Sequence, residues 1–205
     1  MRILALDVDG VLLDPHRGGL GNWTVEMEDA FGITRLQIRE AFFAKSFDDI
    51  LDGHRSVESG VSEALSVIGA DVAVEDFLTV WFEADFVPID DAIAWAGRAH
   101  DAGCRVVLST NQEYRRAGFL RERLGAMMTI DDVLYSADLG VQKHHAAFFE
   151  LASVRLGLGL EQRNDVVFVD DVEYYVMEAR AAGWRAVHAA PGADWVSEAE
   201  RLLGL

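Results

Sequence analysis

The chain has 205 residues, of which 51% are hydrophobic and 26% are charged. This balance is typical of a folded globular protein and excludes a disordered or collagen-like chain. The formal net charge is -17 at pH 7, so nucleic acid and anionic membrane surfaces repel the chain and we expect it to bind neither. The same charge repels a small anionic substrate, so a site for one needs a local cation, either a metal ion or a lysine.

Short apolar runs predict the strands of a parallel sheet. The runs are continuous rather than alternating, as in strands that helices cover on both faces. They lie at residues 3–6, 105–109, 133–135 and 166–169, with a weaker run at 186–188. Helical patterns separate them at residues 90–102, 115–124, 145–156 and 172–182. This alternation predicts an α/β fold with a doubly wound parallel sheet and right-handed crossovers.

The stretch between the first two predicted strands is organised differently. Residues 15–88 contain no convincing strand but show helical patterns at 23–31, 34–44, 56–68 and 74–86. A glycine-rich segment at 18–21 begins this stretch and Pro88 ends it. An all-helical block in an alternating chain predicts an inserted domain. We therefore expect a core domain formed by residues 1–14 and 89–205, and a helical domain formed by residues 15–88.

One cysteine, Cys104, excludes an intrachain disulfide and lies beside an apolar run, where packing in the core is expected. The first apolar run, at residues 3–6, reaches an acidic residue at Asp7 and is too short for a signal peptide or a membrane-spanning helix. A free thiol suits a reducing compartment, so we expect a cytoplasmic protein.

Pairs of carboxylates follow two of the predicted strands. Residues i and i+2 of an extended chain point to the same side, so Asp7 and Asp9 converge after the first strand. Asp170 and Asp171 follow the strand at 166–169. Ligands of open α/β sheets bind at the carboxyl ends of the strands, where these groups meet if the two strands are neighbours. Hard oxygen ligands of this kind suit Mg²⁺, which bridges carboxylates to a phosphate.

The Asp-Val-Asp-Gly sequence at 7–10 has other interpretations. It could be an acidic turn, but a second acidic pair after a separate strand favours a site. A calcium loop of the EF-hand type is excluded because Val11 and Leu12 occupy positions where that loop needs a ligand and a glycine.

Polar groups near two other strands are candidates for phosphate contacts. Thr110 and Asn111 follow the second strand and can donate hydrogen bonds to phosphate oxygens, although they are also good helix N-caps. The two roles are compatible, because a helix N-terminus attracts anions. Lys143 is one of only two lysines, the other being Lys45, in a chain that otherwise uses arginine. A compact ammonium is therefore indicated at Lys143, with an ordinary surface lysine as the alternative.

In chain order, these motifs resemble those of the haloacid dehalogenase superfamily. They are Asp-Val-Asp-Gly-Val-Leu at 7–12, Val-Leu-Ser-Thr-Asn at 107–111, Gly-Val-Gln-Lys at 140–143, and Val-Phe-Val-Asp-Asp at 167–171 with the helical run that follows to Gly183. The helical insert lies where this family carries its type 1 cap. The resemblance spans essentially the whole chain and implies a Rossmann-like core with an inserted helical cap.

The resemblance also implies a role for each candidate. Asp7 would be the nucleophile that takes the phosphoryl group, and Asp9 would be the general acid and base. Thr110 and Lys143 would hold phosphate oxygens. The magnesium ligands would be Asp7, the backbone carbonyl of Asp9, and Asp170, with Asp171 in support.

The implied function is Mg²⁺-dependent hydrolysis of a small phosphorylated metabolite through an aspartyl-phosphate. Asp9 favours phosphate chemistry, because true dehalogenases resemble the first motif but lack its second aspartate. The cap is most similar to that of sugar-phosphate phosphatases, and Lys45, His54 and Arg55 are candidates for selecting the substrate. The chain departs from the common pattern at Val11, where many members have threonine.

A second departure is His144, where many members have proline, and it bears on the placement of Lys143. Two alternatives remain open from the sequence. A phosphomutase uses the same nucleophile but returns the phosphoryl group to a sugar. A non-enzymatic receiver domain also gathers aspartates, a hydroxyl and a lysine, but it has no use for a large insert after the first strand.

Overall fold

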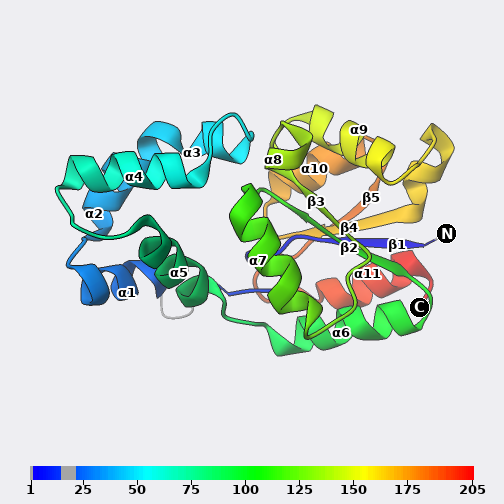
Figure 1. Ribbon diagram of the computed structural model, residues 1–205. Coiled ribbons are helices and arrows are strands. Elements are labelled where there is room, and N and C mark those ends of the chain that lie inside the picture. The colour runs from blue at the N-terminus through cyan, green and yellow to red at the C-terminus, as the bar shows by residue number, and fades with distance from the viewer. Residues whose placement is uncertain (1, 15–21) are drawn as a thin grey trace.

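The computed structural model describes residues 2–14 and 22–205 (Figure 1). Five parallel strands form one sheet in the order β3-β2-β1-β4-β5. They are β1 Ile3–Leu6, β2 Arg105–Thr110, β3 Asp132–Tyr135, β4 Val166–Asp170 and β5 Arg185–His188. In the centre, Leu6 of β1 pairs with Leu108 of β2 and with Val169 of β4. The predicted doubly wound parallel sheet is confirmed, and its winding reverses between β1 and β4.

Helices cover both faces of this sheet. One face packs against α6 Asp90–Asp101, α7 Tyr114–Gly125 and α11 Trp195–Leu203, and the other against α9 Ala146–Arg155 and α10 Glu173–Ala181. The short helix α8 Ser136–Leu139 follows β3 directly, and the short helix η2 Leu160–Asp165 directly precedes β4. Leu4 and Leu6 of β1 face the α6 side, whereas Ile3 and Ala5 face α9 and α10. Burial on both faces explains why the strands are continuous apolar runs.

A block of helices lies beside the sheet (Figure 1). It consists of α1 Asn22–Phe31, α2 Arg35–Ile38, α3 Ala44–Leu51, α4 Val57–Ile68 and α5 Val74–Asp85. These helices, here called the cap, bury a hydrophobic cluster of their own, which includes Phe42, Phe77 and Trp81. The limits of the inserted domain stay a prediction, and the glycine-rich segment at 18–21 lies outside the described residues.

The helix predicted at residues 34–44 continues to Leu51. It begins with a capping box between Thr34 and Gln37 and contains a π-helical turn, η1 Arg39–Phe43, before α3. The wider turn changes the helical period, so a pattern with a period of 3.6 residues does not extend through it. The π turn leads into a group of aromatic rings in which Phe43 lies 5.0 Å from Phe42 and 4.7 Å from Phe47, between ring centroids. Helix α11 was likewise not predicted from the sequence.

Two connecting segments run side by side between the sheet and the cap. Leu13 bridges to Pro88, and the backbone N–H groups of Asp14 and Ile89 donate across to Val87 and Leu12 at 2.8 and 2.9 Å. Within the part of the chain that the structure describes, no helix is both long and apolar enough to cross a bilayer.

The aromatic cluster of the cap gives a stability prediction. Phe42 is fully buried, so Phe42→Ala should lower the free energy of unfolding by about 3–5 kcal/mol through lost contacts and a residual cavity. Val67 on α4 is 58% exposed, and Val67→Ala should change it by less than about 0.5 kcal/mol. Urea unfolding followed by tryptophan fluorescence measures both, and equal effects of the two substitutions would contradict the packing described here.

Candidate active site

Acidic side chains meet where the winding of the sheet reverses. Asp7 follows β1 and Asp170 ends β4, and these strands are paired neighbours. One carboxylate oxygen from each of Asp7, Asp170 and Asp171 lies within 4.8 Å of the others. The first two side chains are buried and Asp171 is half-buried. The strand order therefore brings Asp7, Asp170 and Asp171 together as expected, whereas the expected convergence of Asp9 with Asp7 was wrong, because the Asp9 carboxylate turns to other partners.

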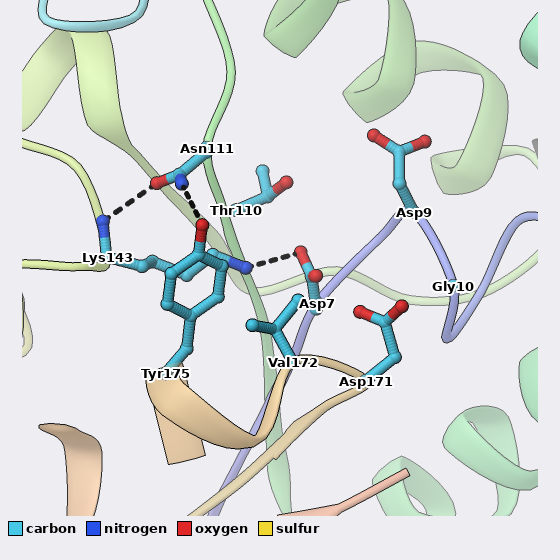
Figure 2. A pocket seen from close by; sticks show the side chains of 9 residues that line it. All are labelled: Asp7, Asp9, Gly10, Thr110, Asn111, Lys143, Asp171, Val172 and Tyr175. Atoms are coloured by element: carbon cyan, nitrogen blue, oxygen red, sulfur yellow. Dashed lines mark hydrogen bonds and ion pairs between the residues drawn. The ribbon is translucent and has the colours of Figure 1, made fainter. Parts of the chain in front are cut away.

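The Lys143 ammonium lies between two of these carboxylates. Its Nζ is 2.8 Å from Asp7 Oδ1 and 2.7 Å from Asp170 Oδ2. Lys143 is only 1% exposed, so the surface-lysine interpretation is wrong. Its backbone N–H donates to Asn111 Oδ1 at 2.8 Å, and its Nζ lies 5.0 Å from the ring centroid of Tyr175 (Figure 2). The loop that follows α8 is thereby fixed to the end of β2, with His144 partly exposed beside it.

Burial and mutual repulsion dominate the electrostatics of this group. Burial raises the pKa of Asp7 to about 8, with Lys143 opposing the shift and Asp170 adding to it. Burial alone would lower the pKa of Lys143, but Asp7 and Asp170 raise it above its ordinary value. Burial, with Asp170, also raises the pKa of Asp171. When all three carboxyl groups are ionised, the single ammonium leaves two negative charges to be balanced, and this is the state that a bound cation would favour. Hard oxygens in this number fit a divalent cation such as Mg²⁺.

Close backbone packing places the Asp171 carboxylate. Gly10 has a φ of +89°, and a Cβ there would lie 2.3 Å from Asp171 Oδ2, so only glycine fits. The imidazole Nε2 of His188, on β5, lies 2.9 Å from the backbone oxygen of Asp171. The glycine of the first motif thus makes room for the second aspartate of the fourth.

The Asp9 carboxylate lies apart from the group of three. Figure 2 shows it turned away from Asp7 and Lys143. Its Oδ2 accepts a hydrogen bond from Gln112 Nε2 and its Oδ1 accepts one from Arg116 Nη2, both at 2.8 Å. The sequence did not single out either donor. The available signal was their spacing, since Gln112 follows Asn111 directly and Arg116 lies one helical turn further along.

Arg116 also faces a carboxylate of the cap. Its Nη2 lies 3.8 Å from Oδ2 of Asp85, the last residue of α5. The same Asp85 oxygen accepts a hydrogen bond from Trp81 Nε1 at 3.0 Å. Arg116 and Asp85 are 7% and 4% exposed. A buried guanidinium therefore stands between a core carboxylate and a cap carboxylate.

A cavity of about 250 Å³ opens at these strand ends (Figure 2). It is lined by Asp7, Asp9, Gly10, Thr110, Asn111, Lys143, Asp171, Val172 and Tyr175. Val172 and Tyr175 were not predicted from the sequence. Among the described residues, no cap side chain lines it. Of the cap candidates, Lys45 and His54 are exposed, and Arg55 pairs with Glu63 at 2.6 Å.

The parallel sheet and the helices on both of its faces define a Rossmann-like α/β fold, with the cavity at the carboxyl ends of the strands. The profile of the family described as haloacid dehalogenase-like hydrolase matches residues 1–183. The chain therefore belongs to this family of hydrolases and is an enzyme. A search of curated proteins finds no match.

Solved structures share the fold over most of their length. The HAD family enzyme bt-2542 from Bacteroides thetaiotaomicron is 15% identical, with a TM-score of 0.75 covering 97% of this chain and 98% of that chain. The same enzyme has been crystallised with magnesium and inorganic phosphate. A HAD-like family hydrolase from Porphyromonas gingivalis is 20% identical, with a TM-score of 0.73 covering 99% and 98%. The L-2-haloacid dehalogenase PA0810 is 16% identical, with a TM-score of 0.66 covering 96% and 89%.

The buried carboxyl of Asp85 gives a pH prediction. Burial raises its pKa to about 6, with Arg116 opposing the shift and Asp9 adding to it. The folded chain then binds this proton more tightly than the unfolded chain, whose aspartates titrate at roughly 3.9. The contribution of Asp85 to stability should therefore fall as the pH rises from about 4 to about 6.

Asparagine at this position does not titrate, so it isolates the effect. The free energy of unfolding of the Asp85→Asn variant, relative to the unsubstituted chain, should increase between about pH 4.5 and about pH 7.5. Urea unfolding of both proteins at the two pH values measures this difference. A difference that is the same at both values would contradict the proton linkage.

Proposed function

We propose that this hydrolase is a Mg²⁺-dependent phosphatase that cleaves a small phosphate monoester through an aspartyl-phosphate on Asp7. The observation that carries the proposal is the group of three carboxylates within 4.8 Å, balanced by only one buried ammonium. Such a site favours a divalent cation together with an anion that the cation and the lysine share. The complex of bt-2542 with magnesium and inorganic phosphate supports the same combination.

In the proposed mechanism, one oxygen of Asp7 attacks phosphorus in line with the ester oxygen. The new bond joins Asp7 to phosphorus, the ester bond breaks, and the leaving oxygen takes a proton from Asp9. Water then attacks the phosphorus of the aspartyl-phosphate and gives its proton to Asp9, which releases phosphate and restores Asp7. Splitting hydrolysis into these two transfers lowers the barrier of each.

The remaining side chains would bind and orient the phosphoryl group. Lys143 holds one oxygen of Asp7, and with Thr110 and Asn111 it lines the cavity where phosphate oxygens would lie. Asp7, the Asp9 backbone carbonyl, Asp170 and Asp171 would hold Mg²⁺, which when bound neutralises charge on the phosphoryl oxygens.

Asp9 favours a phosphatase over a dehalogenase. A departing halide is a stable anion and needs no proton, whereas an ester oxygen does. A carboxyl group that lines the same cavity as the nucleophile and is held by two donors at 2.8 Å suits the second reaction. Family membership as a hydrolase argues against the receiver alternative. The net charge of -17 continues to favour a small-molecule substrate over nucleic acid or membrane partners.

Replacing the nucleophile tests the covalent step. With p-nitrophenyl phosphate and a panel of phosphorylated metabolites, Asp7→Asn should lower kcat by at least about 10³-fold, because an amide oxygen does not form the aspartyl-phosphate. Asp101→Asn, on the exposed surface of α6, is the matched control and should keep full activity. Activity of Asp7→Asn within tenfold of the unsubstituted enzyme would exclude Asp7 as the nucleophile.

Metal removal and product analysis test the rest of the proposal. Excess EDTA should stop phosphate release, because the carboxylates of the site then lose their counter-ion. Added Mg²⁺ should restore it.

Inorganic phosphate should be the product. Isomerised sugar phosphate would indicate a mutase, and halide release from a 2-haloacid without phosphate release would indicate a dehalogenase. Undiminished turnover in EDTA would exclude the metal assignment.

A further inference from the structure

Arg116 lies at the centre of a buried network that joins the cap to the reacting centre. Its Nη2 contacts Asp9 Oδ1 at 2.8 Å and Asp85 Oδ2 at 3.8 Å. The first distance is that of a charge-assisted hydrogen bond, and the second is longer than a hydrogen bond. Asp9 takes its other hydrogen bond from Gln112, so both oxygens of its carboxylate are fixed from the side of α7.

The link to the cap is not fully formed in this arrangement. Asp85 Oδ1 and Arg116 Nε are both buried and have no hydrogen-bond partner among the described residues. Trp81, one turn earlier on α5, donates to the other Asp85 oxygen and fixes the carboxylate to that helix. A movement of α5 by about 1 Å would change the contact between the two charged groups, and with it the hold of Arg116 on Asp9.

Stability alone does not explain this network. Burying a guanidinium and a carboxylate costs more free energy than an imperfect ion pair returns, and apolar residues of similar volume often do as well. The raised pKa of Asp85 agrees with this cost, since burial disfavours its charged form. Charged groups that are buried at a cost in stability occur mainly at functional sites.

We propose that Arg116 is a positioning residue for Asp9, and that Asp85 holds Arg116 in place, so that helix α5 of the cap acts on proton transfer through Asp85, Arg116 and Asp9. This inference rests on the proposed function, in which Asp9 gives a proton to the leaving oxygen. Without Arg116, one carboxylate oxygen of Asp9 loses its donor and Gln112 alone holds the other. The carboxyl group then rotates, and proton delivery weakens while Asp7, Lys143 and the metal ligands keep their geometry.

The leaving group provides a readout that a merely structural role does not move. An alkyl phosphate has a basic leaving oxygen and needs the proton, whereas p-nitrophenolate leaves as a stable anion and needs it little. Values of kcat/KM report the first, phosphoryl-transfer step. Arg116→Met should lower kcat/KM for the best alkyl phosphate of the metabolite panel at least about tenfold more than for p-nitrophenyl phosphate.

Two further variants refine the test. Arg116→Lys keeps the charge and one donor. Its ratio of kcat/KM for the alkyl phosphate to kcat/KM for p-nitrophenyl phosphate should therefore lie between the ratios of Arg116→Met and the unsubstituted enzyme. Asp85→Asn keeps an acceptor for Trp81 but removes the charge that faces Arg116, so it should lower the alkyl-to-aryl ratio by a smaller factor. We expect this variant to fold, because asparagine is close in size to aspartate and keeps an acceptor for Trp81. Arg115→Met is the matched control: Arg115 pairs with Glu58 and Glu75 on the surface and should leave the ratio unchanged.

The outcomes separate this inference from the function on which it rests. If the unsubstituted enzyme hydrolyses neither ester with Mg²⁺ present, the proposed function itself fails. If it hydrolyses both, and the Arg116 variants lose activity equally on the two substrates, Arg116 has only a structural role and the inference is overturned. If Arg116→Met does not fold, an unchanged ratio in both Arg116→Lys and Asp85→Asn overturns it equally.

Discussion

Carboxylates at the ends of two adjacent strands repel one another unless a cation lies between them. The pairing of β1 with β4 places Asp7 and Asp170 side by side, and the backbone N–H of Asp7 donates to the Val169 oxygen at 2.9 Å. Lys143 is buried between them, and its own burial is tolerated only because both partners surround it. Its loop is in turn fixed by Asn111. The sheet, the loop and the balance of charge therefore depend on one another.

Helix α7 connects this charged centre to the cap. Glu113 caps its N-terminus by accepting hydrogen bonds from the backbone N–H groups of Arg115 and Arg116. The two arginines then diverge: the first pairs with cap carboxylates at the surface, and the second turns inward to Asp9. A single capped helical turn thus sets both the outer contact with the cap and the orientation of the group proposed to transfer the proton.

The strand positions and the meeting of Asp7 with Asp170 could be predicted because they follow from local apolar runs and from sheet topology. The partners of Asp9 could not. Arg116 lies in a segment predicted as a helix. Arginine is usually exposed, so a single sequence does not indicate which arginine is buried. Its partner Asp85 is 31 residues away on another helix, and long side chains meet across such distances only once the tertiary packing is fixed. Tyr175 was missed because its contact with Lys143 also depends on tertiary packing between distant segments.

Several contacts outside this network join the cap helices to α7. Arg115 and Arg123 make exposed ion pairs with cap glutamates, worth at most about 1 kcal/mol each and screened by salt. Phe119 adds an aromatic contact with Phe82, worth about 1 kcal/mol beyond its burial. The exposed ion pairs therefore add little to the free energy that opposes separation of the two surfaces. The contact between Asp85 and Arg116 differs from the rest, because both groups are buried and because Arg116 also binds Asp9, so that a movement of the cap reaches the Asp9 carboxylate.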